Sequence, residues 1–247
     1  MALIEEFEAK GNWFFRHRSY LPVVMYVLAS IVIWLQPQDE IMAFDNFTWG
    51  IICFGVSFIG MFVRALVIGF VPKSTSGRNT KEGQVAETLN TQGIYSTVRH
   101  PLYLGNYFMW LGIILYVGNI WFAIVCSLLY WLYYERIMFA EEQFLRGKFG
   151  NAYTDWAKNV PPFWPKWSLW STPGLQFSLK NVLKREYSGL LAMVISFAFL
   201  NGMKHWFLFQ ELMVDTEWIY VFVVGVIITL TLRTLKKKTN VLEVSGR

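Results

Sequence analysis

An arginine and a histidine stand directly before a proline that opens a strongly apolar stretch: Arg99, His100 and Pro101. Proline fits the first turn of a helix, where its missing N–H costs nothing, so a helix should begin at Pro101. Arg99 and His100 should then lie at the positive end of a membrane helix, where free backbone N–H groups can bind an anion. Tyr103 should share a face with His100, and Gly105 should let a flat group approach the backbone closely. The motif predicts a ligand site at the mouth of this helix.

A second cluster of charged residues follows the next apolar stretch of the chain. It contains Arg136 and the adjacent carboxylates Glu141 and Glu142. The two apolar stretches are joined only by residues 118–119, Gly-Asn, which is typical of a tight turn. The stretches should therefore form an antiparallel pair that brings His100 close to Arg136 and Glu141. The alternative is two lipid-facing spans whose polar ends are unrelated.

The composition indicates an integral membrane protein. Of the 247 residues, 55% are hydrophobic and 16% are charged, whereas soluble domains carry about 25% charged residues. Runs of nearly uncharged residues long enough to cross a bilayer recur along the chain. Residues 1–20 are polar and aromatic and show no signal-peptide pattern. The formal charge of +5 suits a membrane face or an anionic lipid and is too dispersed to indicate nucleic acid.

The two cysteines, Cys53 and Cys126, both fall within apolar stretches. They indicate buried free thiols, since neither a disulfide framework nor a zinc site can be read from their spacing. We therefore expect no metal centre.

We predict an all-α integral membrane protein with about six transmembrane helices. The expected spans cover residues 20–35, 47–70, 101–117, 120–134, 188–209 and 218–235. Loops 36–46, 118–119 and 210–217 contain no Lys or Arg, and nearly all of the 22 Lys and Arg residues lie in the other polar segments. The positive-inside rule then places both termini, and the ligand site, on the cytoplasmic side.

The two polar clusters carry a resemblance to a known family. It rests on Gly93-Ile94-Tyr95, Arg99-His100-Pro101-Leu102-Tyr103-Leu104-Gly105, Glu141-Glu142, Phe149-Gly150 with Tyr153, and Val160-Pro161. In order and spacing these blocks resemble the isoprenylcysteine carboxyl methyltransferase superfamily, whose pattern phospholipid N-methyltransferases share. The resemblance covers roughly residues 75–165. It implies S-adenosylmethionine as the methyl donor and a lipid-embedded acceptor, with the membrane as the protein's surroundings.

The resemblance divides the chain into three parts. Residues 1–46 form an N-terminal lead-in with the first span. Residues 47–167 form the methyltransferase core with the cofactor motif, and residues 168–247 form a linker with two further spans. The last two spans lie outside the family core, so their role is left open.

The site residues follow from the motif and from the chemistry of the cofactor. The expected cofactor-binding residues are Asn90, Tyr95, His100, Pro101, Leu102, Tyr103, Gly105, Glu141 and Glu142. The carboxylate of the cofactor should bind at His100 and the start of the helix, and its ribose hydroxyls should bind Glu141 or Glu142. Its sulfonium should lie against the ring of Tyr95 or Tyr103, and its adenine should approach the backbone at Gly105. No Gly-x-Gly-x-x-Gly follows a strand, which excludes a Rossmann methyltransferase. Arg99 and Arg136 are the expected catalytic residues on the acceptor side, with Arg136 displaced by about one position from the family's arginine.

An anionic oxygen is the expected methyl acceptor. Such an oxygen needs no general base, so positioning and positive charge suffice. The loop cations Lys73, Arg78 and Lys81 should join Arg99 and Arg136 in an anion-binding funnel. The sequence at 75–80, with Asn90-Thr91, also resembles the bacterial branch proposed to methylate the lipid A 1-phosphate, which implies a bacterial inner membrane. A lipid-linked carboxylate is a second anionic acceptor.

Three alternatives remain open from the sequence. Phosphatidylethanolamine N-methylation is the first, and an NADPH-dependent membrane reductase and a non-enzymatic membrane scaffold are the others. Arg64 lies inside a span and either is functional or reaches out to lipid head groups. Lys204 and His205, near the outer end of the fifth span, are expected at the membrane interface.

Overall fold

A computed structural model describes residues 2–72 and 84–246 of the chain. Its regular elements are α1 (Leu3–His17), η1 (Arg18–Tyr20), α2 (Leu21–Leu35), α3 (Gln38–Ala43), α4 (Phe47–Phe70), η2 (Ile94–Ser96), α5 (Pro101–Tyr116), α6 (Ile120–Phe149), α7 (Asn151–Asn159), η3 (Trp167–Leu169), α8 (Leu179–Phe209) and α9 (Thr216–Lys238). Within the described ranges the only β-type pairing is an isolated bridge between Gly93 and Ser171. The prediction of an all-α fold is confirmed. The expected funnel cations Lys73, Arg78 and Lys81 lie outside the described residues.

Five helical segments are long and apolar enough to cross a membrane, counting only the described residues. They are Leu3–Leu35, Phe47–Phe70, Ile120–Phe149, Leu179–Phe209 and Thr216–Lys238. The remaining predicted span, α5, has 16 residues and rises about 24 Å, short of the roughly 30 Å of a hydrocarbon core. The chain is thus an integral membrane protein, and the third predicted span is its short central helix.

Two predicted spans are longer than their apolar stretches indicated. The fourth was expected to end at residue 134, but α6 continues to Phe149, and the fifth begins at Leu179 instead of residue 188. Hydropathy marks where a helix leaves the apolar layer, not where its hydrogen bonding stops. At Gly150 the backbone has a φ of 54°, which favours glycine and ends α6 before α7.

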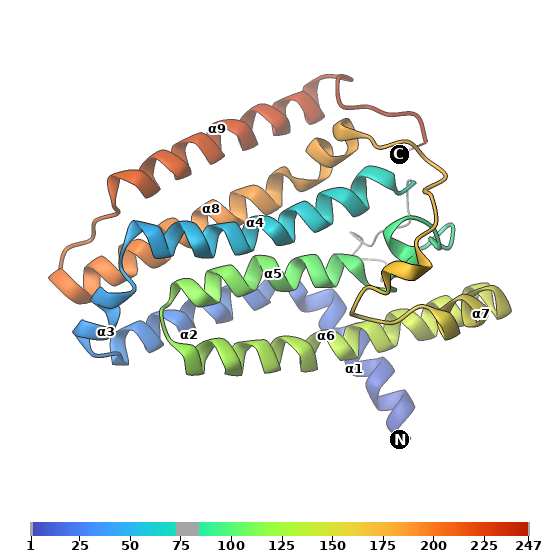
Figure 1. The fold of residues 1–247 in the computed structure, drawn as a ribbon, viewed down its shortest axis with the longest axis horizontal. Helices are drawn as coiled ribbons and strands as arrows, with labels where there is room; N and C mark the ends of the chain where they lie inside the picture. Colours follow the sequence, from blue (N-terminus) through green and yellow to red (C-terminus); the bar gives the residue numbers. More distant parts are fainter. Residues whose placement is uncertain (1, 73–83, 247) are drawn as a thin grey trace.

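Small residues allow α4 and α5 to pack closely. A Cβ at Gly105 would lie 2.7 Å from Cγ of Arg64, and one at Gly112 would collide with the carbonyl oxygen of Cys53. Small residues at a helix interface let backbones approach in membranes, where burial of apolar surface cannot drive association. We expected α5 to pair tightly with α6. In the structure α5 lies between α4 and α6 and packs more closely along α4 (Figure 1).

The N-terminal lead-in is a helix that packs on α6. A Cβ at Gly11 would collide with the carbonyl oxygen of Arg136, and the Tyr133 hydroxyl donates to the Phe14 carbonyl at 2.8 Å. Helix α1 therefore covers the polar end of α6, where the second charged cluster lies.

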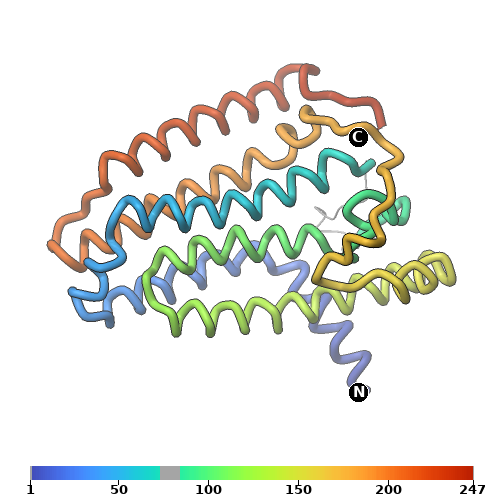
Figure 2. The backbone as a smooth tube through the Cα atoms, viewed as in Figure 1, coloured from blue at the N-terminus to red at the C-terminus, as the bar shows by residue number. Residues whose placement is uncertain are grey.

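The two kinds of loop lie at opposite ends of the bundle. Figure 1 shows both termini and α7 at one end, and the α3 region, the α5–α6 turn and the α8–α9 connection at the other. The tube in Figure 2 shows the segment between α7 and α8 running along the first of these ends, past the start of α5. The loops without Lys or Arg thus share one end, as the charge pattern requires.

Lys204 occupies a buried position at the end of the bundle opposite the termini, which corrects the interfacial expectation for it. Its side chain is fully buried, and Nζ donates to the Phe44 carbonyl at 2.8 Å and lies 3.7 Å from Asp45 Oδ1. His205 Nε2 lies 2.8 Å from Asp215 Oδ1. These contacts join α8 to the loops before α4 and α9. The expectation that Cys53 and Cys126 are buried free thiols is confirmed.

Candidate functional site

The Arg-His-Pro motif is held in place by the segment that follows α7. The backbone N–H groups of Arg99 and His100 donate to the carbonyls of Pro161 (2.9 Å) and Pro162 (3.3 Å). Nearby, Gly93 N–H donates to the Ser171 carbonyl at 3.1 Å. Residues from beyond α6 therefore fix the approach to α5, which begins at Pro101 as predicted.

Glu142 joins the arginine and the histidine of the motif. Arg99 Nη1 donates to Glu142 Oε2 at 2.8 Å, and His100 Nε2 lies 2.9 Å from Glu142 Oε1. Arg99 and His100 come from the residues just before α5, whereas Glu142 lies on the extension of α6 that hydropathy missed. The extra turns of α6 are thus what place the two halves of the motif together.

His100 also faces the second glutamate. Its Nδ1 lies 3.7 Å from Glu141 Oε2, and its ring stacks on Tyr103 with the centroids 5.8 Å apart. An anionic cofactor group at His100 would meet the carboxylates of Glu141 and Glu142, and the cofactor-binding role expected of His100 stays a prediction. Since the Leu104 and Tyr103 amides already donate to the His100 carbonyl, the helix start also offers fewer N–H groups than expected.

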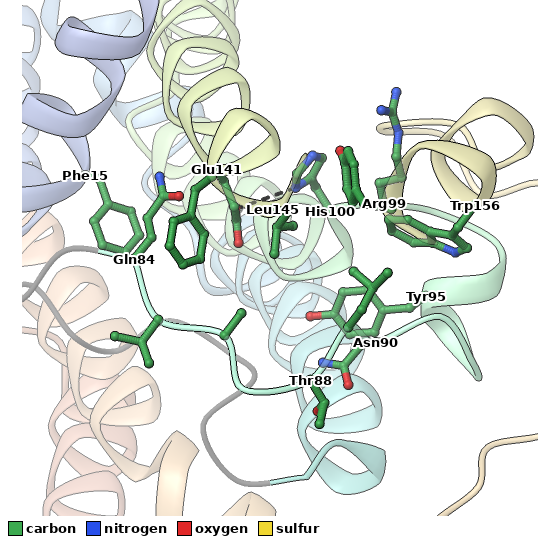
Figure 3. A pocket seen from close by; sticks show the side chains of 15 residues that line it. Phe15, Gln84, Thr88, Asn90, Tyr95, Arg99, His100, Glu141, Leu145 and Trp156 are labelled. Carbon is green, nitrogen blue, oxygen red and sulfur yellow. Dashed lines mark ion pairs between the residues drawn. The ribbon is translucent and has the colours of Figure 1, made fainter. Parts of the chain in front are cut away.

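A first cavity lies beside this cluster (Figure 3). Glu141 and His100 stand on one side of it, Tyr95 and Asn90 on another, and Trp156 of α7 near Arg99. The remaining lining residues are Phe15, Gln84, Val85, Ala86, Thr88, Leu89, Phe144, Leu145 and Tyr153. The cavity is therefore assembled from α1, the segment before η2, α6 and α7.

Four buried polar atoms of the lining residues have no hydrogen-bond partner among the described residues. They are Arg99 Nε, Glu141 Oε2, the Tyr153 hydroxyl oxygen and Trp156 Nε1. Buried polar groups are nearly always paired, because leaving one unpaired costs about 1–3 kcal/mol. Donors and acceptors gathered at one cavity indicate a polar ligand.

Burial of the Tyr95 hydroxyl and the nearby Glu141 carboxylate raise the pKa of this tyrosine well above its ordinary value. Tyr95 is therefore a neutral hydroxyl at any physiological pH. It can present its ring face or donate a hydrogen bond, but it cannot serve as a base.

A second cavity, of about 190 Å³, adjoins the first. The two share Tyr95, Arg99, His100 and Glu141. The other lining residues of the second cavity are Arg18, Arg64, Ile68, Pro101, Leu102, Tyr103, Asn106, Tyr134 and Arg185. Four arginines therefore border a cavity that has a wall in common with the first.

The structure brings most predicted site residues together but separates two. Gly105 faces Arg64 and Gly60 of α4, so the close approach it permits is between helices. Arg136 lines neither cavity. Its guanidinium carbon lies 3.3 Å from the centroid of the Phe7 ring, and the side chain borders an apolar groove between α2 and α6. Because α1 covers this face of α6, Arg136 lies apart from the two cavities, and its catalytic role stays a prediction.

Comparison with known proteins identifies the family. The phospholipid methyltransferase family matches residues 46–152. Protein-S-isoprenylcysteine O-methyltransferase B of Arabidopsis thaliana is 30% identical over 141 residues, which cover 55% of this chain and 71% of that protein. The chain belongs to the isoprenylcysteine and phospholipid methyltransferase superfamily.

Two further relatives show how the similarity is distributed. Protein-S-isoprenylcysteine O-methyltransferase of Schizosaccharomyces pombe is 32% identical over 104 residues, and the match spans 42% of this chain and only 44% of that enzyme. The cobalt-zinc-cadmium resistance protein CzcN of Cupriavidus metallidurans is 29% identical over 172 residues, or 66% of this chain and 70% of that protein. No solved structure matches the chain. In the described ranges, no three His, Cys, Asp or Glu side chains gather as a metal site would require.

Some residues of this superfamily member's site were missed by sequence reasoning. They are Arg18, Trp156 and Arg185, with Arg64 left undecided. Arg64 carried a signal, because a charge inside a membrane span is a functional candidate by default. Arg18 and Arg185 lie in basic segments typical of any cytoplasmic boundary, and Trp156 in a run of exposed and half-buried residues, so nothing local distinguished them.

Proposed function

We propose that this superfamily member transfers a methyl group from S-adenosylmethionine to an anionic oxygen of a lipid-embedded acceptor. The observation that carries the proposal is a pair of adjoining cavities with one common wall. One cavity holds buried polar atoms without partners, and the other is bordered by arginines. A methyl donor and an acceptor must meet at one point, and the common wall provides it.

The first cavity fits the cofactor's polar groups. The Arg99 Nε and Trp156 Nε1 donors suit its carboxylate, and Glu141 Oε2 suits a ribose hydroxyl or the ammonium group. The neutral ring of Tyr95 suits the sulfonium, whose positive charge is attracted to an aromatic face. Asn90 supplies a further polar group in the same wall.

The contacts around His100 keep these groups in position. Glu142 accepts from Arg99 and is bound to His100, so the approach to α5 and the end of α6 are held together beside the cavity. Such a clamp fixes the donors before the ligand arrives, which reduces the entropy lost on binding.

The acceptor side requires little chemistry from the protein. When bound, S-adenosylmethionine supplies an electrophilic methyl group. An anionic oxygen can take it in one in-line displacement without losing a proton, so the residues need only orient the oxygen and stabilise its charge. Arginine side chains are suited to this because they bind phosphate or carboxylate oxygens bidentately.

In this proposal the acceptor is a lipid-linked phosphate or carboxylate. The site lies on the cytoplasmic side of a membrane, which we propose is a bacterial inner membrane. The names of two relatives specify isoprenylcysteine, and lipid A phosphate is the phosphate acceptor suggested by the sequence. Amine methylation of phosphatidylethanolamine is the second candidate. It is favoured by Glu141, a carboxylate on the common wall that could accept the amine proton.

Ligand binding and methyl transfer test the proposal directly. The protein purified in detergent should gain thermal stability from S-adenosylhomocysteine and none from NADPH. With radiolabelled S-adenosylmethionine it should methylate phosphatidic acid or a farnesylated cysteine carboxylate, and not phosphatidylethanolamine. Stabilisation by NADPH alone would defeat the methyltransferase proposal, and exclusive methylation of phosphatidylethanolamine would replace it with the amine reaction.

A further inference from the structure

Arg64 of α4 is fixed by three hydrogen bonds within the helix bundle. Its Nε and Nη2 donate to the two carboxylate oxygens of Glu186 at 2.7 and 2.8 Å, and its Nη1 donates to Asn106 Oδ1 at 2.6 Å. Glu186 lies on α8 and Asn106 on α5, so one guanidinium joins three helices. Its orientation is thereby set by residues far apart in the sequence.

The fixed arginine still faces the second cavity. The three bonds engage three of the five N–H donors of a guanidinium, and Arg64 lines the cavity together with Arg18 and Arg185. A buried ion pair is costly to desolvate and is weak evidence for stability. Because Arg64 lines a cavity, its guanidinium can contact a ligand there, which an arginine enclosed between packed helices could not do.

Arg185 stands next to Glu186 in the sequence and borders the same cavity. Burial raises the pKa of Tyr95, but the charges of Arg185 and Arg64 act on its hydroxyl in the opposite direction. Both arginines line the second cavity together with Tyr95, which belongs to the wall that the two cavities share.

The two sides of the site come from different parts of the chain. The motif residues Arg99, His100, Glu141 and Glu142 fall within the family match at 46–152, whereas Arg18, Arg185 and Glu186 fall outside it. A cofactor is common to a family and an acceptor is not, so residues from outside the matched region are suited to acceptor choice.

We propose that α8 selects the methyl acceptor: Arg185 binds the anionic headgroup, and Glu186 positions Arg64 to bind it as well. This inference rests on the proposed methyl transfer and adds the residues that recognise the acceptor. Two arginines that border one cavity favour a phosphate or carboxylate and disfavour a cationic amine. Glu186 acts through Arg64 and is a positioning residue.

The test compares Arg185→Gln with Lys180→Gln, which removes the same charge from an exposed position on the same helix. With phosphatidic acid or farnesylated cysteine as the acceptor, Arg185→Gln should raise the acceptor KM about tenfold or more. Affinity for S-adenosylhomocysteine should stay within about twofold, and Lys180→Gln should behave as wild type. Arg185→Lys, which keeps the charge, should restore part of the loss.

Arg64→Lys tests the positioning role of Glu186. Lysine keeps the charge but cannot bond both Glu186 oxygens and Asn106 in the same planar geometry. Acceptor kcat/KM should fall about tenfold, whereas a merely structural role would lower cofactor affinity and thermal stability together. If wild type methylates an anionic probe and Arg185→Gln matches Lys180→Gln, the inference fails and the function stands. If wild type binds no S-adenosylhomocysteine or methylates only the amine, both fail.

Discussion

At the scale of single residues, the cofactor side of the site combines paired and unpaired groups. Glu142 accepts from Arg99 Nη1 and contacts His100 Nε2, whereas Arg99 Nε and Trp156 Nε1 are buried without a partner among the described residues. Paired groups hold the site's shape, and unpaired ones carry an energetic cost that only a ligand removes. This difference allows binding residues to be told apart from supporting ones by experiment.

Trp156→Phe should separate stability from binding. The variant keeps an aromatic ring and removes one buried donor, so its free energy of unfolding without ligand should be unchanged or higher, by up to about 1–3 kcal/mol. Its affinity for S-adenosylhomocysteine should fall about tenfold. Thermal melting and isothermal titration in detergent measure both, with the exposed Trp164→Phe as the control. Equal loss of stability and binding would instead make Trp156 a packing residue.

At the scale of the helices, α4 and α5 together form much of the wall of the second cavity. Arg64 and Asn106 come from this pair, and their bond depends on a backbone approach that only small residues permit. The glycines of α5 therefore act on the site through the distance between helices, including Gly105, for which the sequence suggested contact with adenine.

Gly112→Ala should destabilise the bundle, although alanine is the better helix former. The added Cβ would collide with backbone and side-chain oxygen atoms of Cys53 and Ser57, and overpacking of this kind costs about 1–3 kcal/mol. Gly55→Ala is the matched control, because a Cβ at this position of α4 meets nothing within 4 Å. Thermal melting should show a loss for Gly112→Ala alone. Equal melting temperatures for the two variants would show that the interface is looser than the structure indicates.

At the scale of the whole molecule, charge separates the two ends of the bundle. The cavities lie at the end that carries the termini and α7 (Figure 1), which the positive-inside rule assigns to the cytoplasm. The cofactor of the proposed reaction is made in the cytoplasm, so the orientation is a condition of the function.

Cysteine labelling in intact cells should confirm this orientation. Cysteine at the exposed positions Met42 or Leu212 should react with an impermeant maleimide. Cysteine at Val241, in the tail after α9, should react only after the membrane is opened. The native Cys53 and Cys126 are buried and give little background. Labelling at Val241 in intact cells would invert the topology and remove the site from the cytoplasm.

Sequence reasoning was most successful where the signal was local. A proline after Arg99 and His100 determines where α5 begins, and the apolar stretches determine which segments cross the membrane. The motif determined the family. Helix ends were less accurate, because a helix such as α6 continues into water as long as its residues favour helix and α1 packs on it.

What the amino-acid sequence determined by itself is the class of protein and most of its long apolar helices, since these depend on hydropathy and on residues adjacent in the chain. The tertiary structure alone decided that Arg136 stands apart, that His100 faces two glutamates and that Arg64 meets Glu186. Each depends on which faces of separate helices come together. The last depends on a pairing across 122 positions of the chain, which no local pattern of charges encodes.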